Sequence, residues 1–524
     1  MRRIVLSLLI LVSIGYLSYR LFVGIHHDES LLVAMKRENQ RDLEIPVEHA
    51  LFEVLDQEFK DVREVTAACL TCHNGRGNEV MKTSHFQWIR EEFVEGRGVI
   101  KLGKKNVINN FCIGVAGNEH SCMKCHAGFG WEDHKFDFAD ERNVDCLICH
   151  DQSGEYVKGN KMAGLPSPVV NLQKVAKEVG RPSKANCGSC HFFGGGGNNV
   201  KQGDMEVALL DCSREVDVHM SAEGGNMSCV DCHGDANHQI KGKLYTISSM
   251  DRNRVTCIEC HTALPHDERT LNKHTAKISC QTCHIPTYAK VNSTKTSWDW
   301  STAGKLKDGQ PCHEKDSLGN HTYLSIKGSF EWGRNLQPEY TWFNGTAGHY
   351  LVGDQINPDQ VVQMNSLNGN YRDLNAKIVP VKVHRAKIPY DTGRNVLIQP
   401  YLFSHNKGEG ALWQDFNWEK ACEKGMEKVG QAYSGHFGFV KSELYENINH
   451  MIAPKEQALS CVECHQKNGR LAGLTDFYLP GRDSNSIIDF TGKLLLILSL
   501  GGIAIHGSLR AFSASNLKRK KGRK

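Results

Sequence analysis

The sequence predicts a mainly α fold with extensive loops, little sheet and a helix at each end in the membrane. Three observations lead to this prediction. Only 40% of the 524 residues are apolar, below the roughly 45–50% of ordinary soluble proteins, so the interior needs other filling. The chain holds 20 cysteines and 26 histidines. An apolar run also stands beside basic residues at each end.

Most of the cysteines belong to one short pattern, Cys-x-x-Cys-His, which occurs eight times. In chain order, motifs 1 to 8 are residues 69–73, 122–126, 146–150, 187–191, 229–233, 257–261, 280–284 and 461–465. This pentapeptide is the attachment signature of c-type haem. Two thiols three residues apart lie on one helical turn and can form thioethers with the vinyl groups, while the next residue presents its imidazole to the iron.

Other uses of paired cysteines explain the pattern less well. Zinc sites combine two such pairs and do not need histidine after each second cysteine, and a redox dithiol needs one copy. We therefore expect eight covalent c-type haems and a multihaem cytochrome c fold packed around them. The predicted thioether positions are Cys69, Cys72, Cys122, Cys125, Cys146, Cys149, Cys187, Cys190, Cys229, Cys232, Cys257, Cys260, Cys280, Cys283, Cys461 and Cys464. The predicted iron ligands within the motifs are His73, His126, His150, His191, His233, His261, His284 and His465.

A haem that only transfers electrons usually has a second axial ligand. The histidines favoured for this role lie near a motif or in a well-defined turn: His85, His219, His238, His266, His274 and His450. The weaker candidates are His120, His134, His349, His384 and His405. His26, His27, His49 and His506 lie in or near the expected terminal segments.

Both ends resemble membrane segments. Residues 1–25 carry two arginines and then an apolar run, which is either an uncleaved anchor or a cleaved signal. Residues 493–512 form a second run that is followed by the basic tail 513–524, and an amphipathic or buried helix is the alternative. The positive-inside rule then puts the bulk of the chain in the periplasm or elsewhere outside the cytoplasm. His506, inside the second run, is a candidate ligand for a b-type haem shared with a partner, a neighbour of a quinol site, or a side chain that reaches the interface.

Charge excludes one class of partner. The formal net charge is +4, but ten of the positive charges come from Arg2, Arg3, Arg20, Arg510 and the six lysines and arginines of 513–524, so the rest of the chain is acidic. A mildly acidic exported domain gives no reason to expect nucleic-acid binding.

Several longer strings add a resemblance. They include TSHFQWIR, NNFCIGVAGNEHSCMKCHAGFGW, FDFADERNVDCLICHDQSGEYVK, NCGSCHFFGGGGNNVKQGD, EVDVHM, WFNGTAGHYLVGD, GHFGFVKSELYENINHMIAP and CVECHQKNGRL, in this order. Over residues 65–480 the chain resembles the octahaem tetrathionate reductase family, which is related more distantly to hydroxylamine oxidoreductase and pentahaem nitrite reductase. The resemblance implies reduction of tetrathionate, nitrite or hydroxylamine at one haem that has a lysine as its protein ligand.

The resemblance assigns that lysine to Lys158, with Lys161 as the fallback, at the haem of Cys122 and Cys125. Lysine binds iron only when it is deprotonated, and burial beside a metal favours the neutral form. Motif 2 also contains His126, so the resemblance requires this histidine to be displaced or to bind the opposite face. The sequence leaves that choice open.

The chain then divides by composition. We expect a linker over 26–64, a seven-haem region over 65–290, an aromatic-rich cover segment over 291–455 and the eighth haem in 456–485. Within the cover segment, HTYLSIKGSFEW alternates like a hairpin and ALWQDFNWEKACEKGMEKVGQAY predicts a helix; an unrelated inserted domain is the alternative. Cys112, Cys212, Cys312 and Cys422 remain, and their pairing is open; for Cys112 a structural disulfide is favoured over a place in the lining of the active cavity.

Two functions follow from these features. The first is a membrane-anchored reductase of a small sulfur or nitrogen oxyanion, which takes electrons from the quinol pool through a quinol-oxidising or b-type cytochrome partner and leaves room for a homo-oligomer. The second is a non-catalytic electron conduit between membrane and periplasmic partners. A third hypothesis reverses the chemistry, as an oxidase.

Overall fold

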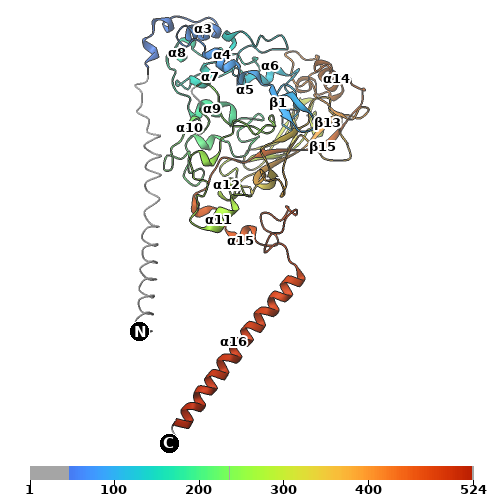
Figure 1. Ribbon diagram of the computed structural model, residues 1–524. Coiled ribbons are helices and arrows are strands. Elements are labelled where there is room, and N and C mark those ends of the chain that lie inside the picture. The colour runs from blue at the N-terminus through green and yellow to red at the C-terminus, as the bar shows by residue number, and fades with distance from the viewer. Residues whose placement is uncertain (1–46, 112, 235–236, 522–524) are drawn as a thin grey trace.

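The computed structural model describes residues 47–111, 113–234 and 237–521. The predicted N-terminal membrane segment and most of the predicted linker therefore lie outside the described residues, as does Cys112. The remaining chain separates into a region of short helices, a large sheet and a long C-terminal helix (Figure 1).

The helical region follows the prediction of short helices joined by loops. Its helices are α3 (Val62–Cys72), α4 (Arg76–Met81), α5 (Ser84–Gln87), α6 (Glu119–Cys122), α7 (Leu147–His150), α8 (Leu172–Lys177), α9 (Lys184–His191), α10 (Cys229–His233), α11 (Arg269–His274), α12 (Cys280–His284) and, much later in the chain, α15 (Cys461–Cys464). These helices are too short to be stable alone, since isolated helices below about 12–15 residues are marginal in water.

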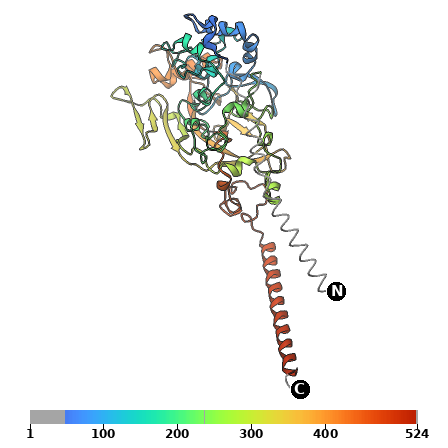
Figure 2. The same cartoon turned by 90° about the vertical axis from the view of Figure 1, so that its left-hand side faces the viewer.

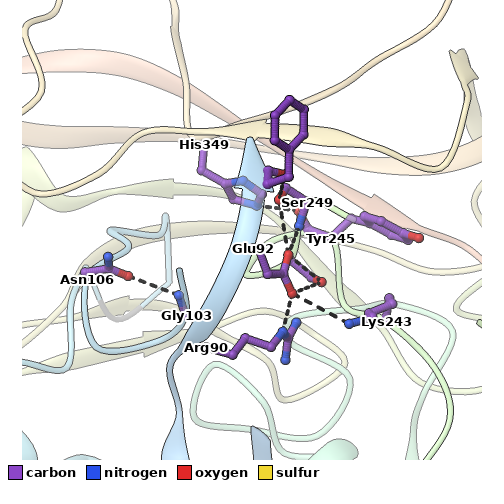
Figure 3. A network of polar contacts seen from close by, with 10 residues as sticks. Arg90, Glu92, Gly103, Asn106, Lys243, Tyr245, Ser249 and His349 are labelled. Atoms are coloured by element: carbon purple, nitrogen blue, oxygen red, sulfur yellow. Dashed lines mark hydrogen bonds and ion pairs between the residues drawn. The ribbon is translucent and has the colours of Figure 1, made fainter. Parts of the chain in front are cut away.

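The β1–β2 hairpin (Arg90–Val94 and Gly98–Leu102) is fixed to the helical region through a buried carboxylate. Glu92 bonds Arg90, the Oγ of Ser248 at 2.9 Å and the backbone N–H of Ser249 (Figure 3). Lys243 Nζ lies 3.6 Å from the same carboxylate. Burial alone would raise the pKa of Glu92, but the Ser249 N–H and Arg90 outweigh it and hold that pKa below its ordinary value.

The prediction of a mainly α fold with little sheet is wrong for the cover segment, which forms a nine-stranded sheet in the order β11-β15-β13-β3-β8-β7-β6, with β14 and β9 also paired to β13. Its strands are β3 (Thr294–Asp299), β6 (His313–Lys315), β7 (His321–Leu324), β8 (Gly328–Gly333), β9 (Glu339–Phe343), β11 (Val362–Gln363), β13 (Lys377–Asp391), β14 (Val396–Leu397) and β15 (Phe437–Asn447). Smaller ladders join β4 (Leu306–Lys307) to β5 (Gln310–Pro311) and β10 (Ala347–His349) to β12 (Asn365–Leu367).

Two local predictions in this segment are confirmed. β7 and β8 pair as the expected antiparallel hairpin. The expected helix is present as α13 (Leu412–Asp415) and α14 (Trp418–Lys428), interrupted at Phe416, whose φ is 52°. Asn417 caps α14 by accepting from the Lys420 N–H at 3.0 Å.

The sheet supports the helical region through its central strand. β13 pairs with β15 along eleven residues, from Val381↔Asn447 to Asp391↔Phe437. The Ile378 carbonyl of β13 accepts from the Thr282 Oγ of α12 at 2.8 Å and from the Ser279 N–H at 2.9 Å. The largest apolar cluster lies on this sheet and includes the stacked pair Trp298 and Trp300, whose ring centroids are 4.7 Å apart.

The last helix, α16 (Ser486–Lys521), extends away from the rest of the molecule (Figure 2). Its stretch Ser486–Ser513 has a mean hydropathy of 1.8 and is long and apolar enough to cross a membrane. No part of that stretch is buried against the protein. The predicted segment 493–512 lies within it.

Candidate haem-binding sites

Each motif is folded as one tight turn. Ser228, Thr256 and Ser460 cap the turns of motifs 5, 6 and 8, and each forms a capping box with the acidic residue three positions on. That acidic residue is the second variable position of the pentapeptide, so the cap and the two cysteines occupy the same turn. The local sequence therefore holds both thiols of these motifs on one side of the backbone.

The histidines outside the motifs pair with the histidines within them. Seven pairs have ring centroids 6.1–6.3 Å apart: His49–His73, His85–His191, His150–His238, His219–His261, His233–His450, His266–His284 and His274–His465. An imidazole nitrogen binds a metal at about 2 Å and the ring centre lies about 1 Å beyond it, so two imidazoles on opposite faces of one iron have centroids about 6 Å apart. The spacing therefore fits two axial histidines at seven of the eight motifs.

Backbone carbonyls orient several of these rings. The Nδ1 atoms of His150, His233 and His465 lie 2.8, 2.9 and 2.9 Å from the carbonyls of Gly180, Lys241 and Pro480. A carbonyl only accepts, so Nδ1 carries the proton and leaves Nε2 free to bind a metal. Burial lowers the pKa of His191 to about 3, which likewise keeps a ring neutral.

His126 of motif 2 is arranged differently. Its Nε2, the atom that would bind iron, lies 2.6 Å from the Phe86 carbonyl, and its Nδ1 is buried without a hydrogen-bond partner. Among the described residues, the rings recorded around it are carbocyclic or indole, with none from histidine: Phe86, Trp88, Trp131, Phe136 and Phe138. Burial in this cage lowers the pKa of His126 to about 3. For His126 to bind iron through Nε2, as predicted, its hydrogen bond to the Phe86 carbonyl would have to be broken.

Lys158 lies next to His126, as the prediction requires, but is engaged there. Its fully buried Nζ is 2.9 Å from Asp145 Oδ2 and 2.9 Å from the Gly128 carbonyl, and it also bonds the His126 carbonyl. Binding of iron would require Lys158 to leave Asp145 and lose a proton, so that role stays a prediction. The fallback, Lys161, places its Nζ 4.4 Å from the ring centroid of Phe403.

Neighbouring cysteines give the spatial order of the motifs. Interacting thiols place motifs 1 and 3 (Cys69, Cys146), 2 and 4 (Cys125, Cys190), 4 and 5 (Cys187, Cys229) and 6 and 7 (Cys257, Cys280) next to each other. Electrostatic neighbours connect motifs 3 and 4 (Cys149, Cys187), 5 and 6 (Cys232, Cys260) and 7 and 8 (Cys283, Cys464). The motifs thus form a row from 1 through 3, 4, 5, 6 and 7 to 8, with motif 2 beside motif 4. The same row is visible in Figure 1 from α3 through α7, α9, α10 and α12 to α15.

A cavity of about 510 Å³ opens next to motif 2. His120, two residues before Cys122, lines it together with His405, and their Nε2 atoms are 3.3 Å apart. Lys105 also lines the cavity, with its Nζ 3.4 Å from the centroid of Phe138 in the cage of His126. Burial, and then the charge of Lys101, lowers the pKa of Lys105 to about 8. The lining further includes His134, Lys428, Glu119 and Glu409.

The six histidines favoured from the sequence as second ligands all lie in the seven pairs, and that they bind iron stays a prediction. His49 was missed because it was assigned to the surroundings of the N-terminal segment. His349 instead bonds the Tyr245 carbonyl at 2.9 Å, and His384 is buried without a hydrogen-bond partner for either ring nitrogen. His506 lies exposed on α16.

The expected disulfide is not found among the described cysteines. Cys212 and Cys422 are free, buried thiols in different apolar clusters, and Cys312 is a free thiol beside the Lys305 carbonyl. No two of these three cysteines therefore form a disulfide with each other. Cys112 lies outside the described residues.

Comparison with known proteins agrees with this geometry. The family model described as "Cytochrome c bacterial" matches residues 295–468. The crystal structure of an octaheme cytochrome c from Shewanella oneidensis is 42% identical, with a TM-score of 0.75, and the match covers 81% of this chain and 96% of that chain. An uncharacterized protein of Archaeoglobus fulgidus is 25% identical over 228 residues, 34% of this chain and 75% of that protein.

The turns and the imidazole pairs define a c-type cytochrome with several haems. The chain belongs to the multihaem c-type cytochromes, the family of the Shewanella protein to which it is similar. It therefore carries covalently bound haem iron and has a redox function.

Proposed function

We propose that the chain carries eight c-type haems and reduces a small sulfur or nitrogen oxyanion, with tetrathionate, nitrite and hydroxylamine as the candidate substrates. The observation that carries the proposal is the difference between motif 2 and the other seven. Seven motifs have a histidine pair spaced for two axial ligands, while in the described part of the chain His126 has no histidine partner and its Nε2 is already bonded. An iron with an open position supplies electrons directly to a bound substrate.

The residues at motif 2 divide the work as follows. Cys122 and Cys125 hold the haem, and Lys158 is the candidate protein ligand. Asp145 keeps Lys158 buried and close to the motif, at 2.9 Å. Only a neutral lysine binds a metal, so a haem at motif 2 would be held by Lys158 in that form, released from Asp145.

The cavity beside motif 2 supports a reaction that consumes protons. His120 and His405 face each other there, so a proton on one ring can be shared with the other. Lys105 and Lys428 supply positive charge against an oxyanion, and Glu119 lies at the same wall. Desolvation by burial raises the pKa of Glu119, which favours its proton-carrying form.

Membrane attachment is part of the proposal. α16 provides a candidate span, and residues 466–485 fix its start to motif 8: His465 Nδ1 is 2.9 Å from the Pro480 carbonyl, and Leu471 and Leu479 are buried with Trp342. A quinol-oxidising or b-type cytochrome partner in the membrane would therefore meet motif 8, with His506 as the residue of α16 able to contribute a ligand. The bulk of the chain lies in the periplasm in this proposal.

A non-catalytic conduit is the second candidate, because seven of the eight motifs are already arranged for electron transfer alone. The two functions differ at motif 2. Low-temperature EPR of the oxidised protein is expected to show a high-spin ferric signal that changes on addition of nitrite or cyanide. Eight low-spin signals, all unaffected by these anions, would leave the conduit and contradict the reductase.

Activity tests the cavity. With reduced viologen as donor and tetrathionate, nitrite or hydroxylamine as acceptor, His405→Ala is expected to lower kcat/KM by about a hundredfold, the lower end of the range for loss of a general acid or base. His436→Ala, which changes an exposed histidine, is the control.

EPR tests the lysine ligand. The high-spin signal should change in Lys158→Gln and persist in Lys161→Gln. An unchanged signal in Lys158→Gln would show that Lys158 is not the protein ligand of this haem.

A further inference from the structure

Two of the paired histidines contact carboxylates instead of carbonyls. His450 Nδ1 lies 3.1 Å from Asp204 Oδ2, and His238 Nδ1 lies 2.9 Å from Glu79 Oε2. A carboxylate only accepts from the ring, so both imidazoles donate through Nδ1 and direct Nε2 at the partner ring. These rings belong to the pairs of motif 5 (His233) and motif 3 (His150).

Asp204 is buried, and backbone N–H groups hold its carboxylate in place. Its side chain is 2% exposed. The same Oδ2 accepts the backbone N–H groups of Asn449 at 2.8 Å and His450 at 2.9 Å, while Oδ1 has no hydrogen-bond partner in the described part of the chain. The ammonium of Lys382 interacts with the charge of Asp204 but donates its hydrogen bonds to Val200, Lys201 and Thr294. The charge of Asp204 therefore acts on the ring of His450 with little neutralisation.

Glu79 makes the same contact under weaker conditions. Its side chain is 29% exposed, and Arg76 donates to both of its oxygens at 2.8 and 2.9 Å. Water and the guanidinium screen most of its charge. The chain thus contains a strong and a weak version of one interaction, at two different motifs.

We propose that Asp204 is a positioning residue that lowers the reduction potential of the haem held by motif 5 and His450, and that Glu79 does the same more weakly for motif 3. Hydrogen bonding from Nδ1–H to a carboxylate makes the ring a stronger donor through Nε2, and a buried negative charge favours the ferric over the ferrous state. The effect is largest where the effective dielectric constant is low, which is the site of Asp204. Motif 5 stands inside the row, between motifs 4 and 6, so electrons that travel the row meet a low-potential position near its middle.

The experiment is a spectroelectrochemical titration of the full-length holoprotein, with EPR of the oxidised state and haem content by mass spectrometry. In Asp204→Asn we expect one haem to titrate at a more positive potential, one low-spin EPR signal to shift, and the haem content to stay at the wild-type value. Glu79→Gln should move a different haem, in the same direction and by less. Asp204→Glu, which keeps the charge, should restore much of the wild-type potential if Asn disturbs folding.

Asp217 provides the matched control. It is equally buried and accepts the N–H groups of Met451 and Ile452 in the same loop. It also accepts the backbone N–H of His219, and its charge reaches the rings of His219 and His450, but in the described part of the chain it accepts no hydrogen bond from a ring. Asp217→Asn should therefore keep the low-spin signal of motif 5 in place and shift the potential of that haem less than Asp204→Asn. The proposal is overturned if Asp204→Asn moves no potential, or if Asp217→Asn reproduces its effects. The inference rests on the haem assignment of the proposed function, but no substrate is used, so a failed reductase assay leaves it standing.

Discussion

At the scale of the residue, the position of one proton distinguishes the imidazoles. A ring that donates from Nδ1 to a carbonyl or carboxylate has Nε2 left for a metal, as in His150, His233 and His465. His126 uses Nε2 for its bond to Phe86 instead. A motif alone cannot reveal this difference, because the same Cys-x-x-Cys-His pattern occurs in both arrangements.

His49 provides the first prediction. Its ring centroid lies 6.2 Å from that of His73, so we expect it to be the second ligand at motif 1. His49→Ala should convert one low-spin ferric haem to high spin, because the iron loses a strong-field ligand, while the other haems keep their signals. EPR and the absorption spectrum of the oxidised protein measure this. A spectrum identical to that of His436→Ala, which changes an exposed histidine, would contradict the assignment.

The sequence reveals partners that stand near a motif and conceals those that do not. His85, His219 and His274 lie within about a dozen residues of a motif, and this proximity makes them candidates. His450 reaches motif 5 from the far end of β15, and was favoured for its turn. His49 lies upstream of all motifs, where the apolar N-terminal segment suggested a linker. The contact of Lys158 with Asp145 also depends on folding, because the two residues are thirteen positions apart and no single helix carries both.

At the scale of the element, β13 shows why the sheet was not predicted. Twelve of its fifteen positions are buried or partly buried, on both faces, so the strand lacks the alternation that predicts a half-buried strand. Lys382 and His384 are fully buried within it and further obscure an apolar run. The hairpin β7–β8 kept its alternation and could be predicted.

Glu92 provides a prediction for the β1–β2 hairpin (Figure 3). Glu92→Gln removes the charge that Arg90 and Lys243 face, so we expect a loss of about 2 kcal/mol in stability at pH 7. Because the folded-state pKa of Glu92 is lowered, its contribution is complete above the unfolded pKa of about 4.3 and is lost as the pH falls through the folded pKa. The difference between the variant and the wild type should therefore vanish at low pH.

Thermal unfolding at pH 7 and pH 3 measures this difference. The matched control is Glu91→Gln, since Glu91 is exposed on the opposite face of the same strand. A deficit of Glu92→Gln that persists unchanged at pH 3 would show that shape, and not charge, determines the effect.

At the scale of the whole molecule, the apolar interior is divided. The largest cluster belongs to the sheet, while the clusters of the helical region are separate and smaller. The low apolar fraction anticipated this division, because haem supplies the filling that the side chains do not. The same composition could not reveal that the cover segment, 291–455, which contains no motif, forms a sheet with a core of apolar side chains.

α16 provides the prediction at this scale. A stretch of 28 residues is about 42 Å long as a helix, more than the roughly 30 Å of a bilayer core. With residues 1–25 replaced by a cleavable signal in both chains, we expect the full C-terminus to remain in the membrane after carbonate extraction. Deletion of residues 486–524 should release the protein with its haem content unchanged. Recovery of the α16-containing chain in the soluble fraction would contradict the span.

The capped turns of motifs 5, 6 and 8 have a consequence for how the protein matures. The backbone N–H groups of Ser228, Thr256 and Ser460 donate to the carboxylates of Asp231, Glu259 and Glu463, at 2.7, 2.8 and 2.9 Å, so each bond closes within four consecutive residues. A turn this short is stable only when it is packed, but its own bonds need no distant residue, so it can form transiently in an unfolded chain. Covalent attachment of haem can therefore trap a correctly shaped cysteine pair before tertiary assembly instead of after it.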